Sequence, residues 1–148
     1  MHIPDGFLSV PVAAGTGAIA ALAVASALRR THPESEPGLA PRMGMTAAYV
    51  FAAQLVNFPV AAGTSGHLLG SVLAAVLLGP HAAAVVMASV FLVQAFFFLD
   101  GGHTALGANI LNMGLHMVEH GNKRIPQRRF DGVDLTTDLH GVTCAKQY

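Results

Sequence analysis

The first residues of the chain, MHIPDGFLS, place a histidine at the second position. The Met1 amine, the deprotonated amide nitrogen of His2 and the His2 imidazole can bind one metal ion in a five-membered and a six-membered chelate ring. A planar set of four nitrogen ligands favours Ni(II) or Cu(II) over Zn(II), which prefers a tetrahedron. The fourth ligand must then be an imidazole from elsewhere, and His67 is the candidate. The start of the chain thus predicts a nitrogen-rich metal site of Met1, His2 and His67.

The residues after His2 predict a segment that turns back on itself. Pro4 disfavours a helical conformation at Ile3, and Pro4-Asp5-Gly6 is a turn sequence. We therefore expect the first three residues to be extended and the chain to reverse before Phe7, so that the terminus can enter the mouth of a helical bundle. A histidine near a terminus or in a glycine-rich turn also has ordinary structural roles, and the residues alone leave both interpretations open.

Charged residues are few in this chain, and they are unevenly distributed. Only 11% of the 148 residues are charged and 53% are hydrophobic, whereas an ordinary soluble domain has about 25% charged residues. Seven charged residues lie in 1–114 and nine in 115–148. This distribution predicts a membrane-embedded domain over 1–118 that contacts the lipid bilayer. It also predicts a polar cytoplasmic tail over 119–148, for which disorder or an aberrant origin stays open.

Long uncharged stretches predict an all-α fold, a polytopic transmembrane helical bundle of four to five spans. A helix needs about 20 apolar residues to cross the hydrocarbon core of a bilayer. The stretches 7–28, 43–63 and 81–99 approach that length, 68–79 is shorter, and 104–118 contains two asparagines. The predicted bundle carries an inserted N-terminal metal-binding loop and ends in the polar tail.

The orientation follows from the positive residues beside the predicted spans. Arg29, Arg30 and Arg42 flank the first loop, so the positive-inside rule places that loop in the cytoplasm and the N-terminus outside. If 68–79 crosses the membrane, which we favour over a re-entrant path, the turn that holds His67 also faces outside. His2 and His67 then lie on the same external face.

Several function classes are disfavoured by the same composition. Acidic and basic residues are equal in number, so nothing indicates nucleic-acid binding, which needs a basic face. The only cysteine, Cys144, excludes an intrachain disulfide and a multi-cysteine metal site. Gln54 and Asn57 are three residues apart and share a helix face. We favour a helix-to-helix hydrogen bond for Gln54 and a contact with the metal site for Asn57.

A second motif, His116-Met-Val-Glu119-His120, matches the inverted zinc-protease pattern H-x-x-E-H. Its two histidines would share a helix face, and Glu119 could activate a water molecule. Only 28 residues follow the motif, too few for the further ligand and substrate cleft of a protease. A membrane-embedded zinc hydrolase is therefore kept as the alternative interpretation.

Three long segments resemble a known family. MHIPDGFLS at 1–9, QLVNFPVAAGTSGHLLG at 54–70 and DGGHTALGANILNMG at 100–114 are similar to the CbiM/NikM-type cobalt/nickel substrate-capture subunits (S components) of energy-coupling-factor ABC transporters. The resemblance implies a non-enzymatic protein of the bacterial or archaeal cytoplasmic membrane that needs no cofactor and binds the Co(II) or Ni(II) it transports. The ligands it implies are Met1, His2 and His67. Apart from the resemblance, Asn57, Ser65 and His103 are candidates to hold these ligands in place, and His103, where relatives have apolar residues, could also be an accessory ligand or an ordinary exposed loop residue.

The resemblance also implies partners. These are a transmembrane T component, two cytoplasmic ABC ATPases and a small auxiliary membrane subunit, which together deliver the ion for uses such as cobalamin biosynthesis. Relatives continue with apolar sequence beyond the third segment, whereas 119–148 is polar, so the chain looks C-terminally truncated or frame-shifted. A non-functional fragment of the transporter therefore stays open, as does the choice between cobalt and nickel.

Overall fold

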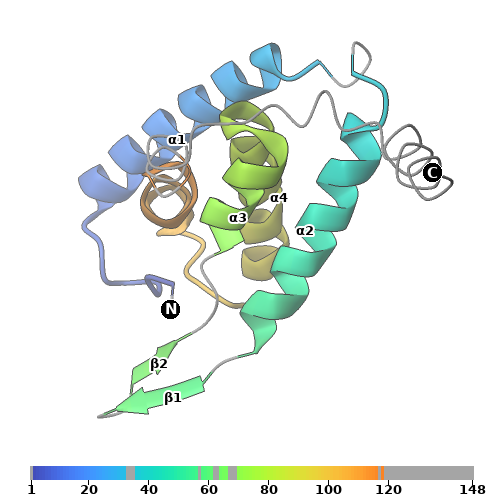
Figure 1. Cartoon of the computed structure of the whole chain (residues 1–148). Coiled ribbons are helices and arrows are strands. Elements are labelled where there is room, and N and C mark those ends of the chain that lie inside the picture. Colours follow the sequence, from blue (N-terminus) through green and yellow to red (C-terminus); the bar gives the residue numbers. More distant parts are fainter. Residues whose placement is uncertain are drawn as a thin grey trace, which may run out of the picture.

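The uncharged apolar stretches of the sequence form helices, as predicted. The computed structural model describes residues 2–32, 36–56, 58–61, 64–66, 70–116 and 118. Its elements, shown in Figure 1, are α1 (Val10–Arg30), α2 (Leu39–Leu55), β1 (Phe58–Ala61), β2 (Thr64–Gly66), α3 (Gly70–Leu78), α4 (Pro80–Phe97), α5 (Leu106–Asn109) and the π-helix η1 (Ile110–His116). The predicted fold class, an all-α membrane bundle, is confirmed. Among the described residues the exception is the short hairpin formed by β1 and β2.

Helix α1 shows why the first apolar stretch becomes a helix where it does. Proline occupies its first turn, where backbone N–H groups have no partner within the helix and the fixed φ of proline is helical. Arg29 and Arg30 lie in its last turn, where positive charge interacts favourably with the helix dipole. The helix begins at Val10, three residues later than the predicted span, because residues 5–8 form a turn.

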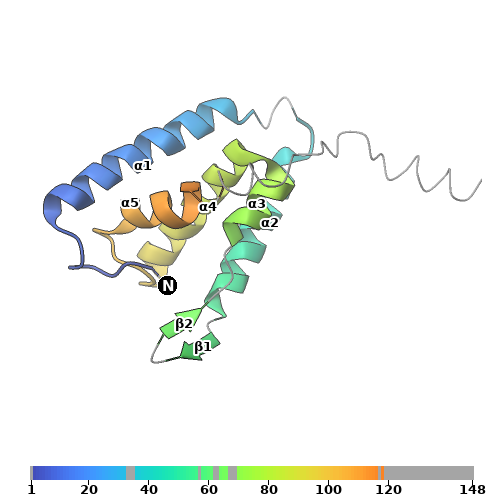
Figure 2. The same ribbon diagram turned by 60° about the vertical axis from the view of Figure 1, so that its left-hand side comes forward.

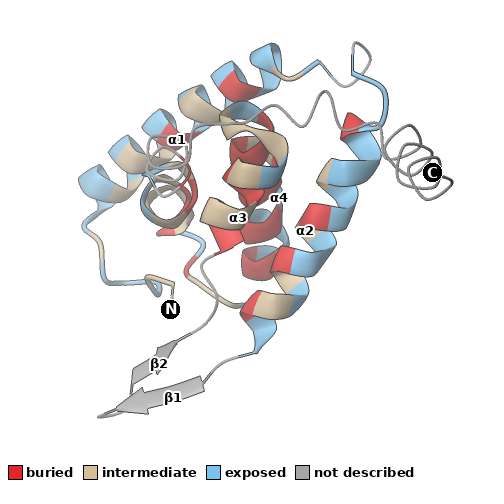
Figure 3. Cartoon of the chain, viewed as in Figure 1, coloured by how far each residue is buried: buried red, intermediate tan, exposed pale blue. Residues whose placement is uncertain are grey.

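Helix α4 is the centre of the bundle. It packs against α1, α2, α3 and η1, and Figure 3 shows its buried surface between the exposed outer faces of α1 and α2. In the most apolar 18-residue stretch of each helix, 56% of α4 is buried inside the structure, compared with 11% of α1. Both helices are long and apolar enough to cross a membrane. Large apolar side chains such as Ile19 and Leu22 are exposed on α1, which suits a surface in contact with lipid.

The predicted span 43–63 is wrong at its C-terminal end. Helix α2 stops at Leu55, and β1 and β2 follow as an antiparallel pair in which Phe58 is opposite Gly66 and Pro59 is opposite Ser65. Proline inside a helix removes a backbone donor and clashes with the preceding turn, and it biases the residue before it towards extended conformations. Pro59 therefore explains why the apolar sequence continues as a strand.

The two weaker stretches are also helical, but they are short. Helix α3 has nine residues, which is about 14 Å of helix and less than the thickness of a hydrocarbon core. The stretch 104–118 contains α5 and, directly after Asn109, η1. The buried Ser71 hydroxyl of α3 donates a 2.7 Å hydrogen bond to the Met113 carbonyl of η1. The total of four to five spans stays a prediction.

Candidate metal site

The N-terminal segment returns across one end of the bundle. Residues 2–4 form no helix, and a turn follows at Asp5 and Gly6, where the φ of Gly6 is 82°. The predicted turn at Pro4-Asp5-Gly6 is therefore confirmed. Figure 2 shows the segment lying beside the loop between α4 and α5, at the same end of the molecule as the β1–β2 hairpin.

The backbone of Ile3 is held by the segment 100–109. Its N–H donates a 2.8 Å hydrogen bond to Asn109 Oδ1. Its carbonyl accepts one from Asn109 Nδ2 at 3.2 Å and one from the Gly102 N–H at 3.0 Å. The Asn109 amide thus pairs with both polar groups of one residue, much as a neighbouring strand would.

Asp5 makes a second attachment to the same segment. Its Oδ1 accepts hydrogen bonds from the Thr104 hydroxyl at 2.6 Å and from the Thr104 N–H at 2.8 Å. Chiefly because of the Thr104 hydroxyl, these bonds lower the pKa of the Asp5 carboxyl below its ordinary value. His103 lies beside the pair, with Nδ1 3.7 Å from Asp5 Oδ2. Its ring makes a T-shaped contact with Phe96 at a centroid distance of 5.0 Å.

The His2 imidazole is buried at this end of the bundle. Its side chain is 3% exposed, and its Nδ1 lies 3.1 Å from Asp100 Oδ1. The ring meets Phe91 of α4 in an edge-to-face contact with centroids 5.3 Å apart. In many metal sites a carboxylate holds the ring nitrogen that does not bind the metal, whereas Asp100 contacts Nδ1. A chelate with the His2 amide would use Nδ1, so an ion bound there would replace the Asp100 contact.

Two glycines leave the space that the N-terminal segment fills. Gly101 has a φ of +104°, and a Cβ there would lie 2.9 Å from His2 Cβ. A Cβ on Gly102 would overlap the Asp5 amide nitrogen and lie 2.7 Å from the Pro4 carbonyl carbon. Side chains at these positions would displace the segment, so the pair Gly101-Gly102 forms a close-fitting surface for residues 2–5.

The other predicted site residues are placed only in part. Met1, Asn57 and His67 lie outside the described residues. Ser65 is in β2, one residue before the strand ends at Gly66. The predicted ligand set stays a prediction, and among the described side chains no three His, Cys, Asp or Glu come together as a metal-binding group.

Sequence reasoning missed two residues of this site, Asp100 and Asn109. From the sequence, Asn109 is only a polar interruption of the apolar stretch 104–118. A usable signal existed, because ionisable and polar residues within membrane segments are costly and usually functional. Asp100 is the only charged residue between Arg42 and Glu119.

The predicted helix-to-helix role of Gln54 is supported by a buried hydrogen bond. Gln94 Nε2 of α4 donates to Gln54 Oε1 of α2 at 2.9 Å, and the two residues are 0% and 1% exposed. In the described part of the chain, Gln94 Oε1 has no hydrogen-bond partner. Gln94 was not predicted as part of this pair.

Of the alternative H-x-x-E-H motif, His116 and Val118 are described. His116 is the last residue of η1, and Glu119 and His120 lie outside the described residues. The geometry of a zinc hydrolase therefore receives no support from the structure.

A family model and individual relatives both match this chain, and both concern cobalt or nickel transport. Residues 2–144 match the family model described as CbiM, the cobalt uptake substrate-specific transmembrane region. The fused nickel transport protein NikMN of Rhodobacter capsulatus is 41% identical over 115 residues, which are 78% of this chain and 33% of that protein. The cobalt transport protein CbiM of Geobacter sulfurreducens is 38% identical over 118 residues, 78% of this chain and 34% of that protein.

Two solved structures are similar in fold as well as in sequence. A truncated transition metal transporter has a TM-score of 0.69 and 36% identity over 77% of this chain and 53% of that chain. A second transition metal transporter has a TM-score of 0.67 and 35% identity over 78% of this chain and 51% of that chain. The chain thus spans about a third of the two transport proteins and about half of the two solved chains. With the helical bundle and the matching family model, these similarities show that the chain belongs to the CbiM family of substrate-specific transmembrane regions for cobalt uptake.

Proposed function

We propose that this chain binds Co(II) or Ni(II) at its N-terminal end and serves as the substrate-specific membrane component of a cobalt or nickel uptake transporter. The observation that carries the proposal is the buried His2 imidazole, held beside Asp100 by a docked N-terminal segment. Membership of the CbiM family and the names of the relatives, which are cobalt and nickel transport proteins, support the same activity.

The proposed ligands are the Met1 amine, the amide and imidazole nitrogens of His2, and the His67 imidazole. The docked segment supports this set because His2 lies at the end of the bundle that also carries the hairpin preceding His67 (Figures 1 and 2). Asp100 would add a negative charge near the divalent ion. Asn57, Ser65 and His103 are proposed to support the ligands without binding the ion.

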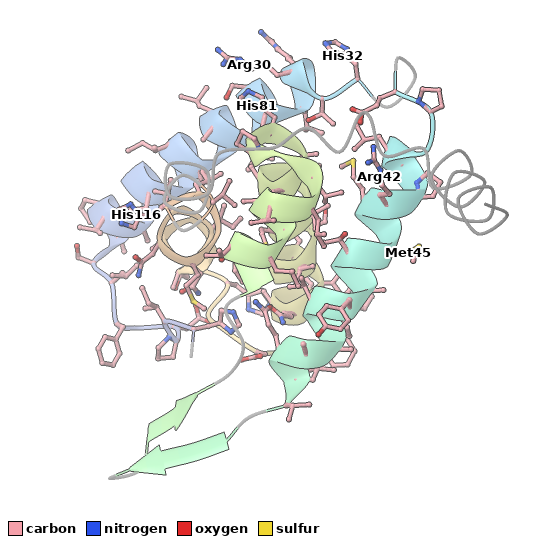
Figure 4. The ribbon with its side chains drawn as sticks, in the orientation of Figure 1. Arg30, His32, Arg42, Met45, His81 and His116 are labelled. Carbon is pink, nitrogen blue, oxygen red and sulfur yellow. The ribbon has the colours of Figure 1, made fainter. Side chains whose placement is uncertain are left out.

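The proposed orientation places this end outside the cell. Arg30, His32, Arg42 and His81 lie towards the opposite end of the bundle (Figure 4), and positive residues concentrate on the cytoplasmic side. We propose a membrane-embedded domain over 1–118 and a cytoplasmic tail over 119–148, in the cytoplasmic membrane. The partners would be a T component, two ABC ATPases and a small auxiliary subunit, and the chain itself would be neither an enzyme nor dependent on a cofactor.

Metal retention by the full chain purified in detergent tests the proposal. After loading with Ni(II) or Co(II) and desalting, the wild type should retain one ion per chain, and His2→Ala and His67→Ala should each lose it. His81→Ala is the matched control, because this histidine lies towards the opposite end (Figure 4). Retention that survives His2→Ala would overturn the proposal.

A two-residue extension before Met1 tests the chelate itself. The extension keeps every side chain and moves the terminal amine out of register, so the ion should be lost. One added residue would not serve, because a histidine third in the chain forms another planar four-nitrogen chelate for Ni(II). Mass spectrometry of the purified protein checks that the polypeptide starts at Met1 with a free amine. His120→Ala separates this proposal from the zinc hydrolase. The variant should retain the ion, because only the hydrolase requires that histidine. A wild type that retains no ion would instead favour a non-functional fragment.

A further inference from the structure

Hydrogen bonds hold the N-terminal segment against the rest of the bundle. Besides the His2–Asp100 contact, five hydrogen bonds join residues 3–5 to the segment 100–109, three at Ile3 and two at Asp5. Their partners are Gly102, Thr104 and Asn109. All five bonds lie after His2 in the chain, so they act on the proposed chelate through the backbone.

We propose that Asp5, Thr104 and Asn109 are positioning residues that hold the N-terminal chelate in place, and that the opening of their contacts sets the rate at which a bound ion leaves. This inference rests on the proposed function, because it concerns the residence time of the ion at that same site.

The length of the chain between the attachments and the chelate makes the coupling tight. Ile3 directly follows His2, and Asp5 is three residues from it, which is at most about 11 Å of extended chain. A tether this short keeps the nitrogens of the first two residues at a high effective concentration beside the rest of the site. When these contacts open, Met1 and His2 move away from His67 together, so the ion loses its fourth ligand and becomes accessible to a competing chelator.

The surface beneath the segment fits this role. Gly101 and Gly102 allow the backbone of residues 2–5 to approach so closely that a Cβ on Gly102 would meet Asp5 and Pro4. The docked position is thus selected by shape as well as by hydrogen bonds. A methyl group at position 102 should shift the segment without removing any polar group.

The hydrogen bonds between Asp5 and Thr104 are exposed to water, so they can break and form again. The Asp5 side chain is 51% exposed, so water competes for its carboxylate whenever the bonds to Thr104 break. Hydrogen bonds exposed in this way contribute modestly to stability. This property suits a contact that must open and close repeatedly while an ion is captured and passed on.

Nickel release from the loaded full chain in detergent tests the inference. Excess chelator is added, and the visible absorption of bound Ni(II) is followed with time. Thr104→Val, which removes one hydroxyl at nearly constant shape, should accelerate release by roughly threefold to tenfold. Gly102→Ala should accelerate it at least as much, and Thr104→Ser should restore the wild-type rate.

Two control variants make the same chemical changes elsewhere. Thr31→Val removes a hydroxyl that donates to the Ala27 carbonyl at the far end of α1. Gly44→Ala adds a methyl group where no atom lies within 4 Å of the new Cβ. Both should release nickel at the wild-type rate. The absorption spectrum at saturation should be the same in all variants, because the ligands are unchanged.

The outcomes separate this inference from the proposed function. If the wild type retains nickel and both Thr104→Val and Gly102→Ala release it at the wild-type rate, the inference alone is overturned. A changed spectrum in Thr104→Val would also overturn it, because the residue would then act on the ligands themselves. A wild type that retains no nickel overturns the proposed function and this inference with it. Thermal unfolding of each variant shows whether a faster release reflects a misfolded chain.

Discussion

At the scale of single residues, the character of the site comes from a buried imidazole beside a carboxylate. The His2 side chain is almost fully buried, whereas Asp100 is 35% exposed. The imidazole therefore has a fixed position, and the carboxylate can still adjust. Asp100 is also close enough to influence any ion that binds at Nδ1.

The charge of Asp100 should strengthen metal binding. A unit charge about 5 Å from a divalent ion is worth a few kcal/mol at an effective dielectric constant of about 20, although partial exposure reduces this. The hydrogen bond that the imidazole gives up is worth about 1 kcal/mol, so the attraction outweighs it. We expect the loss of this attraction in Asp100→Asn to weaken Ni(II) binding at least about tenfold, as measured by competition with a chelator.

Glu36→Gln is the control for this prediction. Glu36, in the loop before α2, pairs with Arg42 of α2 at 2.6 Å, so its neutralisation changes the net charge by the same amount far from the site. Nickel affinity should be unchanged. Tighter binding in Asp100→Asn would mean that the carboxylate competes with the ion for His2.

At the scale of the elements, two close contacts hold the helices that present the site. The Gln54–Gln94 hydrogen bond joins α2 to α4. On the other side of the bundle, Gly107 of α5 approaches the backbone of α1 at Gly17 so closely that a Cβ would overlap it. Asn109, which holds Ile3, is two residues from this contact. The packing of α5 on α1 thus fixes the position of the segment 100–109, which holds the N-terminal segment.

The two glutamines should depend on each other. Gln94→Leu leaves Gln54 Oε1 buried without its donor, and such a loss costs about 1 kcal/mol in a membrane protein. Gln54→Leu should cost a similar amount, and the double variant should cost less than the sum of the two. Thermal unfolding of all four proteins in one detergent measures this cycle. Additive losses would show that the bond does not stabilise the bundle.

The glycine contact should tolerate no methyl group. Gly107→Ala should lower the thermal unfolding temperature by several degrees, because the new Cβ meets the backbone of α1. Gly15→Ala is the matched control: nothing lies within 4 Å of a Cβ at Gly15, and alanine favours helix over glycine by about 1 kcal/mol. Equal unfolding temperatures for the two variants would contradict the close packing.

At the scale of the whole molecule, the two ends of the bundle differ in chemistry. One end carries the N-terminal segment, His2 and the hairpin, and the other carries Arg29, Arg30 and the loop before α2 (Figures 1 and 4). Apolar side chains cover the outer faces between them. Polar and charged groups at the two ends, with apolar faces between them, are typical of a membrane protein.

Thiol labelling in intact cells should reveal the orientation. In a Cys144→Ser background, a cysteine placed by Phe7→Cys should react with a membrane-impermeant reagent, because Phe7 is 79% exposed and lies at the proposed external end. A cysteine placed by His32→Cys should react only after the cells are opened, since positively charged loops stay in the cytoplasm. The reverse pattern would place the site inside the cell and contradict capture from outside.

The sequence by itself determined the membrane class, the helices, the turn after Pro4 and the family resemblance. These features depend on local properties, namely composition, runs of apolar residues, proline stereochemistry and contiguous motifs. It also pointed to His2, because a chelate at a chain terminus needs only neighbouring residues. Where a local rule was overlooked, as for Pro59 inside the predicted span 43–63, the prediction was wrong although the signal was present.

Only the tertiary structure decided which distant groups meet at the candidate site. His2 with Asp100, Ile3 with Asn109 and Asp5 with Thr104 are each about 100 residues apart. No periodicity or motif predicts such pairs, because they depend on how α1, α4 and α5 pack and on the space left at Gly101 and Gly102. The proposed metal chemistry is thus local to the chain's first residues, whereas the surface that holds those residues forms only when the bundle has folded.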